Sequence, residues 1–171
     1  MKLVAAALLC LGGLAAAEPA SFAPIYRVLT HPRCLNCHVA GDRPRQGDEG
    51  RVHDFRVIRG ADDHGAAAMR CVACHRGFNN GRIPGAPHWG LAPRSMAWEG
   101  LTPAQLCVRL QDKQANGGRD LPALVQHMAA DPLVGWAWQP GADRTPAPLP
   151  KDEFVRLLRA WAAQGGPCPP Q

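Results

Sequence analysis

Two five-residue stretches share one pattern, Cys34-Leu35-Asn36-Cys37-His38 and Cys71-Val72-Ala73-Cys74-His75. The spacing C-x-x-C-H is typical of covalent haem attachment, because two thiols three positions apart can bond the two vinyl groups of one porphyrin. The histidine that follows then meets the iron axially. The pattern therefore predicts two covalently bound haem c groups, with His38 and His75 as proximal ligands. The four predicted attachment residues are Cys34, Cys37, Cys71 and Cys74.

Two other uses of paired cysteines fit this sequence less well. Four thiols could hold one tetrahedral zinc ion, but the spacer between the pairs is longer than in the usual zinc ribbon, and zinc requires no histidine after both pairs. A redox-active C-x-x-C dithiol is typically found near a βαβ unit, and this sequence contains no βαβ pattern. Haem attachment accounts for every defined position of both stretches.

The first residues of the chain predict export. A short positive start precedes an apolar run over residues 3–14, and Ala17 ends a run of three alanines, so we expect residues 1–17 to be a cleaved signal peptide. A retained anchor would need about 20 apolar residues. A lipoprotein modified at Cys10 would need small residues just before the cysteine, but Leu8 and Leu9 stand there. We therefore expect the mature chain in the oxidising periplasm, without a transmembrane segment.

The composition after the signal peptide is poor in large apolar side chains. The chain has 18 Gly and 17 Pro, and Leu, Ile, Val and Phe make up less than about a fifth of the residues after Ala17. This excludes a large aliphatic core, a coiled coil and a protein that spans a membrane several times. Two porphyrins would supply the missing apolar surface. The predicted fold class is mainly α with long irregular loops, a dihaem cytochrome c-like arrangement of helices and Gly- and Pro-rich segments that wrap the haems.

Helical spacing of apolar residues is found near the start of the mature chain and in its last third. The predicted helices cover residues 21–29, 102–114, 120–130 and 151–164. We expect one compact domain, in which residues 18–100 bind both haems and residues 101–171 pack on them as a helical region. The apolar stripe Phe154, Leu157, Leu158 and Trp161 is predicted to be core rather than a partner surface, because the chain has few apolar residues to spare.

The two remaining cysteines after the signal peptide are Cys107 and Cys168. An oxidising compartment favours a disulfide between them, with two free thiols as the alternative. The bond would tie the C-terminal tail to the helix that begins after Thr102.

The sixth iron ligands are predicted from a near-repeat. His53 follows His38 by 15 residues and His88 follows His75 by 13, and both intervals are rich in Gly, Pro and Arg. Such loops can fold back over a haem face, so we predict His53 and His88 as the distal ligands. The spacing does not decide which haem each of them serves.

Other residues are weaker candidates for the distal positions. His31 precedes Cys34 closely, and Met96 is the best sulfur donor, which would raise the reduction potential. His64 is a further candidate outside the repeat. His127 lies in a predicted helix and is expected to be a packing or solvent residue.

Several stretches carry a resemblance to a known group of proteins. They are residues 29–38 (LTHPRCLNCH), 85–89 (GAPHW) and 96–100 (MAWEG). The chain resembles bacterial dihaem c-type cytochromes, and more narrowly it is similar to small exported proteins labelled as an isoquinoline 1-oxidoreductase subunit. The resemblance runs over nearly the whole mature chain. It implies an electron-accepting subunit of a periplasmic dehydrogenase and implies no substrate.

The expected function is transfer of single electrons between redox protein partners. Two axial ligands per iron leave no open site for a substrate, so the chain is not expected to be an enzyme. The alternative is a peroxidase-like haem enzyme or ligand sensor with one five-coordinate haem. A third possibility is an assembly subunit whose haems mainly stabilise the fold. The net charge of +5 is offset by haem propionates, so no nucleic-acid partner is expected.

Overall fold

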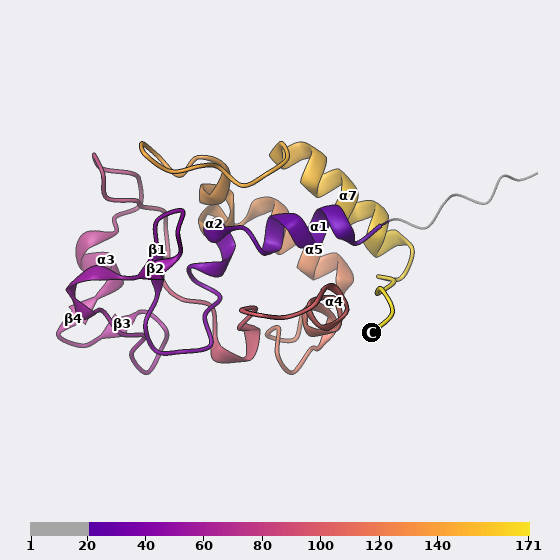
Figure 1. Ribbon diagram of the computed structural model, residues 1–171, viewed down its shortest axis with the longest axis horizontal. Helices are drawn as coiled ribbons and strands as arrows, with labels where there is room; N and C mark the ends of the chain where they lie inside the picture. The colour runs from indigo at the N-terminus through magenta and orange to yellow at the C-terminus, as the bar shows by residue number, and fades with distance from the viewer. Residues whose placement is uncertain (1–20) are drawn as a thin grey trace, which may run out of the picture.

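The computed structural model describes residues 21–171, and its longer helices gather at one end of the molecule (Figure 1). These helices are α1 (Ala23–Leu29), α4 (Pro103–Gln111), α5 (Leu121–Ala130) and α7 (Lys151–Ala163). The other end holds the short turn α3 (Cys71–Cys74) and two small hairpins. The predicted signal peptide, residues 1–17, lies outside the described residues.

Each hairpin consists of two antiparallel strands of two residues. The pairs are β1 (Arg45–Gln46) with β2 (Arg51–Val52), and β3 (Gly65–Ala66) with β4 (Met69–Arg70). Gly65 has a φ of +93°, and a Cβ there would lie 2.5 Å from the Met69 carbonyl oxygen, so the second hairpin requires glycine at this position. The hairpins were not expected from the sequence, because strands of two residues leave no alternating pattern.

Short helical turns connect the larger elements. They are α2 (Pro32–Leu35), α6 (Pro132–Gly135) and the 3₁₀ turns η1 (Asp54–Arg56), η2 (Arg94–Met96) and η3 (Trp136–Trp138). Regular structure is thus mainly helical with long irregular segments, which confirms the coarse fold class, and the short strands make it mixed.

The core lies between the longer helices. α1 packs against α4 and α7, and α7 packs against α5. The largest fully buried side chains include Ile25, Val28, Leu106, Leu110, Phe154, Leu158 and Trp161. Three of the four residues of the predicted α7 stripe are therefore core, as expected, and Leu157 is half-buried. Because α1 belongs to this cluster, the helical core includes residues from both sides of position 100.

The predicted helices are confirmed, with boundaries that differ by at most three residues. Thr102 forms a capping box with Gln105: its hydroxyl accepts from the Gln105 N–H, and the Gln105 side chain accepts from the Thr102 N–H. Asp120 caps α5 by accepting from the Ala123 N–H at 2.9 Å. These caps satisfy backbone donors that each helix start leaves unpaired.

The expected disulfide joins Cys107, which is fully buried on α4, to Cys168 in the C-terminal tail. The indole N–H of Trp161 donates to the Pro167 carbonyl at 2.9 Å, so the tail is also held by a side chain of α7. In residues 21–171, no helix is long and apolar enough to cross a membrane.

Candidate haem-attachment sites

Both C-x-x-C-H stretches fold into one helical turn. In the first, the His38 backbone N–H donates to the Cys34 carbonyl at 3.1 Å; in the second, the His75 backbone N–H donates to the Cys71 carbonyl at 2.9 Å. Residues three apart on such a turn are neighbours on its surface. All four cysteines of the two stretches are free thiols. Each turn therefore carries two neighbouring thiols followed directly by an imidazole.

The imidazole of His38 is held at two points. Its Nδ1–H donates to the Met96 carbonyl at 2.7 Å, and its ring stacks on Trp98 with centroids 3.3 Å apart. Because a carbonyl oxygen can only accept, the proton lies on Nδ1 and the lone pair on Nε2. A backbone carbonyl on one ring nitrogen is the arrangement that orients a metal-binding histidine.

The imidazole of His75 is held in the same way. Its Nδ1–H donates to the Pro84 carbonyl at 2.7 Å, and its ring stacks on Trp89 with centroids 4.5 Å apart and planes 6° apart. Trp89 in turn packs edge-on against Trp136. The two attachment turns thus repeat one arrangement: a carbonyl on Nδ1, an indole on the ring and Nε2 left free.

The first turn lies deeper in the protein than the second. Burial raises the pKa of the Cys34 thiol to about 12 and that of Cys37 to about 11, and it lowers the pKa of His38 to about 4. By residue accessibility, all three are half-buried. In the second turn burial raises the pKa of Cys71, whereas Cys74 is exposed.

The two turns are close to each other. After burial, the largest cause of the raised Cys37 pKa is the charge of the Cys71 thiolate. The Ala92 N–H donates to the Cys37 carbonyl at 3.2 Å, and the Leu91 N–H donates to the Asp63 carbonyl at 2.8 Å. The segment around Leu91 therefore connects the first turn to the loop that leads into the second.

His53 lies against His75. The two ring centroids are 6.0 Å apart with planes at 73°, and the His53 Nδ1–H donates to the Asp54 carbonyl at 2.7 Å. Two imidazoles that bind opposite faces of one iron at about 2 Å also have centroids about 6 Å apart. Phe55 and Arg56, which follow, both have positive φ, a conformation that costs free energy in residues other than glycine. The loop after the first turn thus reaches the second.

Three other predicted candidates have different surroundings. His88 is exposed with a φ of +60°, and within residues 21–171 its side chain makes no hydrogen bond or ring contact. The Nδ1 of His31 accepts from the Arg33 N–H at 3.3 Å, so its Nε2 carries the proton and not a lone pair. Met96 is buried in the helical core and approaches His38 through its carbonyl, on the Nδ1 side. Among the ring contacts of the described chain, neither His31 nor His88 meets His38 or His75.

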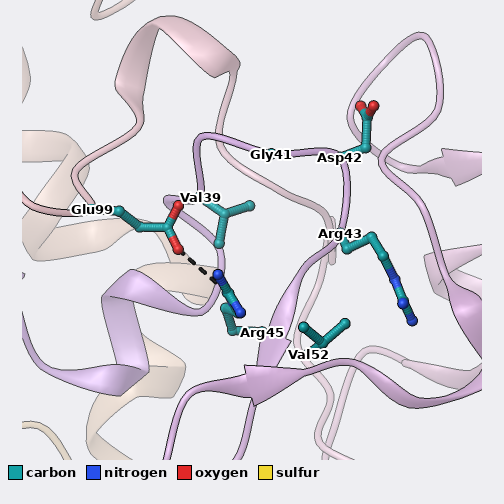
Figure 2. A pocket seen from close by; sticks show the side chains of 7 residues that line it. All are labelled: Val39, Gly41, Asp42, Arg43, Arg45, Val52 and Glu99. Atoms are coloured by element: carbon teal, nitrogen blue, oxygen red, sulfur yellow. Dashed lines mark hydrogen bonds and ion pairs between the residues drawn. The ribbon is translucent and has the colours of Figure 1, made fainter.

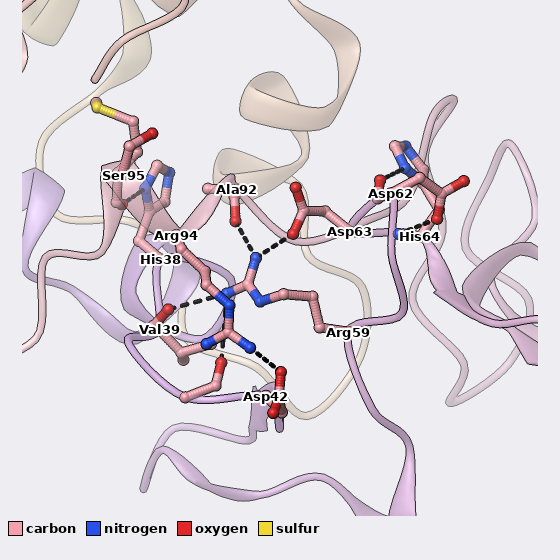
Figure 3. Close-up of polar contacts among 12 residues, drawn as sticks. His38, Val39, Asp42, Arg59, Asp62, Asp63, His64, Ala92, Arg94 and Ser95 are labelled. Atoms are coloured by element: carbon pink, nitrogen blue, oxygen red, sulfur yellow. Dashed lines mark hydrogen bonds and ion pairs between the residues drawn. The ribbon is translucent and has the colours of Figure 1, made fainter. Parts of the chain in front are cut away.

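His64 resembles the proximal histidines in its hydrogen bonding. Its Nδ1–H donates to the Asp62 carbonyl at 2.6 Å. Its ring packs against Gly90, where an added Cβ would lie 3.0 Å from Nε2 of His64. Figure 3 shows His64 on the far side of Arg59 from His38.

His127 is the histidine that was expected to be a packing or solvent residue. It is half-buried on α5, and its Nδ1 lies 3.4 Å from a carboxylate oxygen of Asp131, one helical turn further on. The charge of His127 contributes to lowering the pKa of His38, after burial.

Buried donors without a partner surround the first turn. In the described chain they are the Nε–H groups of Arg33 and Arg59 and the Nε1–H of Trp98; Asn36 Oδ1 is an unpaired acceptor. Arg59 also donates to the Val39 carbonyl (Figure 3). Arginine and indole N–H groups pair well with carboxylates such as haem propionates. The deep free thiols, the oriented imidazoles and these unpaired donors fit a covalently bound haem.

A small recess borders the first turn (Figure 2). Its volume is about 180 Å³, and Arg45 pairs with Glu99 at 3.3 Å on its wall. Its lining residues are Val39, Gly41, Asp42, Arg43, Arg45, Val52 and Glu99. The recess is below the range of about 300–1,000 Å³ of small-molecule sites, so we assign it no ligand.

No metal-binding group of three or more His, Cys, Asp or Glu side chains is present among residues 21–171. A c-type haem takes at most two protein ligands per iron and does not require such a group. Comparison with protein-family models, with curated proteins and with solved structures finds no match to this chain.

Proposed function

We propose that this chain is a dihaem c-type cytochrome that passes single electrons between redox proteins. The observation that supports it best is the repeated arrangement at His38 and His75: each follows two free thiols on one turn, donates Nδ1–H to a carbonyl and stacks on an indole. A repeat of this kind is not needed for packing alone. When bound, haem supplies one-electron exchange between Fe(III) and Fe(II).

The chain's own residues hold and tune the haems. Each cysteine thiol would add across one vinyl group: a C–S bond forms, the vinyl double bond becomes single, and the hydrogen goes to the neighbouring carbon. His38 and His75 would bind iron through Nε2. The carbonyls of Met96 and Pro84 would make those imidazoles more basic, which favours Fe(III) and lowers the potential. His53 would be the sixth ligand of the iron in the second haem, whose fifth ligand would be His75.

The short separation of the two turns supports a relay within one molecule. The segment around Leu91 hydrogen-bonds both to the Cys37 carbonyl and to the Asp63 carbonyl in the loop before the second turn, so one short segment links the two attachment points. We further propose export to the periplasm and a partner role beside a dehydrogenase. The second turn, with its exposed Cys74, is the nearer of the two to the surface and is the better entry point for electrons from a partner.

Haem content tests this proposal. The chain is expressed with a c-type maturation system, and the haem is quantified by the pyridine haemochrome method and by intact mass. We expect two haems per chain, and one haem in Cys71→Ala/Cys74→Ala. Cys107→Ala/Cys168→Ala is the matched control and should retain two. A chain that matures without covalent haem contradicts the proposal.

A second candidate function is favoured by one difference between the sites. His75 has a histidine ring beside it, whereas the ring contact of His38 within the described residues is with Trp98 alone. A five-coordinate first haem would make the chain a peroxidase-like enzyme or a ligand sensor. High-spin ferric protein that binds cyanide or peroxide rapidly would favour this function, and fully low-spin protein would favour the electron carrier.

A further inference from the structure

The carbonyl that holds His75 belongs to a peptide group that is bonded at both ends. Its oxygen, on Pro84, accepts from the His75 Nδ1–H at 2.7 Å. Its N–H, on Gly85, donates to Oδ1 of Asn79 at 3.0 Å. A hydrogen bond from the N–H of a peptide group polarises that group and makes its carbonyl a stronger acceptor. A continuous hydrogen-bond chain therefore runs from Asn79 through one peptide group to His75.

The side-chain amide of Asn79 has a second partner that also bears on His75. Its Oδ1 accepts from the Nε1–H of Trp136 at 2.9 Å, and Trp136 packs edge-on against Trp89, the indole that stacks on His75. Its Nδ2 donates to the Gln139 carbonyl at 2.9 Å. Two N–H donors at one end and a carbonyl at the other fix which end of the amide is oxygen. Both restraints on the His75 ring therefore meet at one side-chain oxygen.

The turn that follows Asn79 brings its amide to Gly85. Asn80 and Ile83 exchange two backbone hydrogen bonds of 2.9 and 3.0 Å, which hold the two ends of the turn together. Gly85 is buried, and a Cβ there would lie 2.5 Å from the carbonyl oxygen of Arg76, so only glycine fits. The backbone thus sets the position of the amide oxygen. The partners of Asn79 on the helical side are 57 and 60 residues away, so no sequence pattern marks this residue.

The first attachment turn has the same hydrogen-bond chain with a different end. The Met96 carbonyl accepts from the His38 Nδ1–H, and the N–H of the same peptide group donates to the Arg94 carbonyl at 3.1 Å. That last acceptor belongs to the backbone, so it is present whatever the side chain. At the second turn the last acceptor is the side chain of Asn79, which a different residue would remove. The two sites can therefore be adjusted separately at this position.

We propose that Asn79 is a positioning residue that sets the reduction potential of the second haem through His75. The proposal rests on the proposed function and goes beyond it, because it assigns control over one haem to a residue that acts through another residue. A stronger acceptor at Nδ1–H makes the imidazole more basic at Nε2, which favours Fe(III). Asn79 thus lowers the potential of the second haem, and Trp136 makes that effect depend on the helical region.

Nuclear magnetic resonance and redox titration of Asn79→Ala test the proposal. Without an acceptor for the Gly85 N–H, the hydrogen bond of His75 weakens. In the ferrous protein the His75 Nδ1–H resonance should move upfield, and the potential of one haem should rise, while the His38 Nδ1–H resonance and the other potential stay unchanged. Asn80→Ala is the matched control, because this exposed side chain makes no hydrogen bond within residues 21–171, and it should change neither quantity.

An Asn79→Ala protein with two haems, an unshifted His75 proton and unchanged potentials overturns the proposal and leaves the proposed function intact. A shift of both potentials alike also overturns it. Absence of haem from the wild-type protein would instead refute the proposed function.

Asn79→Asp separates polarisation from packing and covers the case in which Asn79→Ala does not mature. This variant keeps both acceptor bonds and loses the donor to Gln139, and its negative charge polarises the peptide group further. The His75 Nδ1–H resonance should move downfield, opposite to its shift in Asn79→Ala. A merely structural role predicts an upfield shift in both variants, and that result overturns the proposal. In the wild-type protein the Gly85 amide should exchange slowly with solvent deuterium, and fast exchange contradicts the hydrogen-bond chain.

Discussion

The nitrogen that an imidazole leaves free is decided by what its other nitrogen contacts. In His38, His53 and His75 a backbone carbonyl accepts from Nδ1–H, so Nε2 is available to a metal. In His31 a backbone N–H donates to Nδ1, so the ring proton lies on Nε2 and Nε2 has no lone pair for a metal. Residue spacing cannot distinguish these cases, because the acceptors at His38 and His75 are Met96 and Pro84, which are 58 and 9 residues away.

A prediction at the scale of single residues concerns His53 and His88, both of which the near-repeat in the sequence predicts as distal ligands. His53→Ala should convert the second haem to high-spin, because its ring is the one beside His75. His88→Ala should leave the ferric spectrum unchanged, because the side chain is exposed and, in the described chain, without contacts. The two variants are compared by absorption and electron paramagnetic resonance at equal haem content. The opposite pattern would remove His53 from the iron.

The elements of this protein are short, and single residues decide whether they form. The β3–β4 hairpin leads directly into α3 and holds Gly65 at a φ of +93°. The β1–β2 hairpin is fastened to the first turn by Arg33, whose guanidinium donates to the Gly47 carbonyl and to Asp48. Both attachment turns are therefore supported by a hairpin.

Gly65→Ala should destabilise the holoprotein by about 1–3 kcal/mol. The reason is that a Cβ would meet backbone atoms of Met69 and Cys71 at 2.5 and 2.8 Å, neither of which can move away freely. Gly41→Ala is the matched control, because a Cβ there meets nothing within 4 Å. Urea unfolding followed by the Soret band and by far-UV circular dichroism measures the difference. Equal stabilities of the two variants would show that the hairpin tolerates a side chain.

The disulfide between Cys107 and Cys168 stabilises the helical end of the molecule, away from the two hairpins. Cys107→Ala/Cys168→Ala should lower the free energy of unfolding by about 4 kcal/mol, because the bond closes a long loop in the unfolded chain. The haem spectra should be unchanged, since the tail contacts α4 and α7 rather than the attachment turns. Unfolding in urea with and without a reductant checks the first point. A change in spin state would contradict the second.

At the scale of the whole molecule, the apolar residues are divided unevenly. The core cluster comes mainly from α1, α4, α5 and α7, whereas nearly all exposed large apolar side chains lie between positions 52 and 83. They include Val52, Phe55, Ile58, Met69, Val72, Phe78 and Ile83. Such a concentration is expected where a large apolar group is to be covered. Under the proposed function that group is haem.

Without haem, the segment from Arg33 to about Gly100 should therefore lose most of its order, while the helical core keeps part of it. The variant Cys34→Ala/Cys37→Ala/Cys71→Ala/Cys74→Ala removes both attachments. Amide hydrogen exchange, compared with the holoprotein, should show fast exchange across this segment and protection in α4, α5 and α7. Strong protection throughout the segment would mean that the protein side chains alone hold it.

The sequence by itself predicted the attachment motifs, the main helices and the disulfide, because each depends on local spacing or on a simple count. Thiols three positions apart meet on one turn, and a capping box is complete within four residues. The surroundings of the histidines were decided only by the tertiary structure. His53 lies against His75 and not His38, and the indole of Trp98 stacks on His38. These contacts join residues far apart in the chain, where packing and backbone acceptors set the geometry and spacing has no influence.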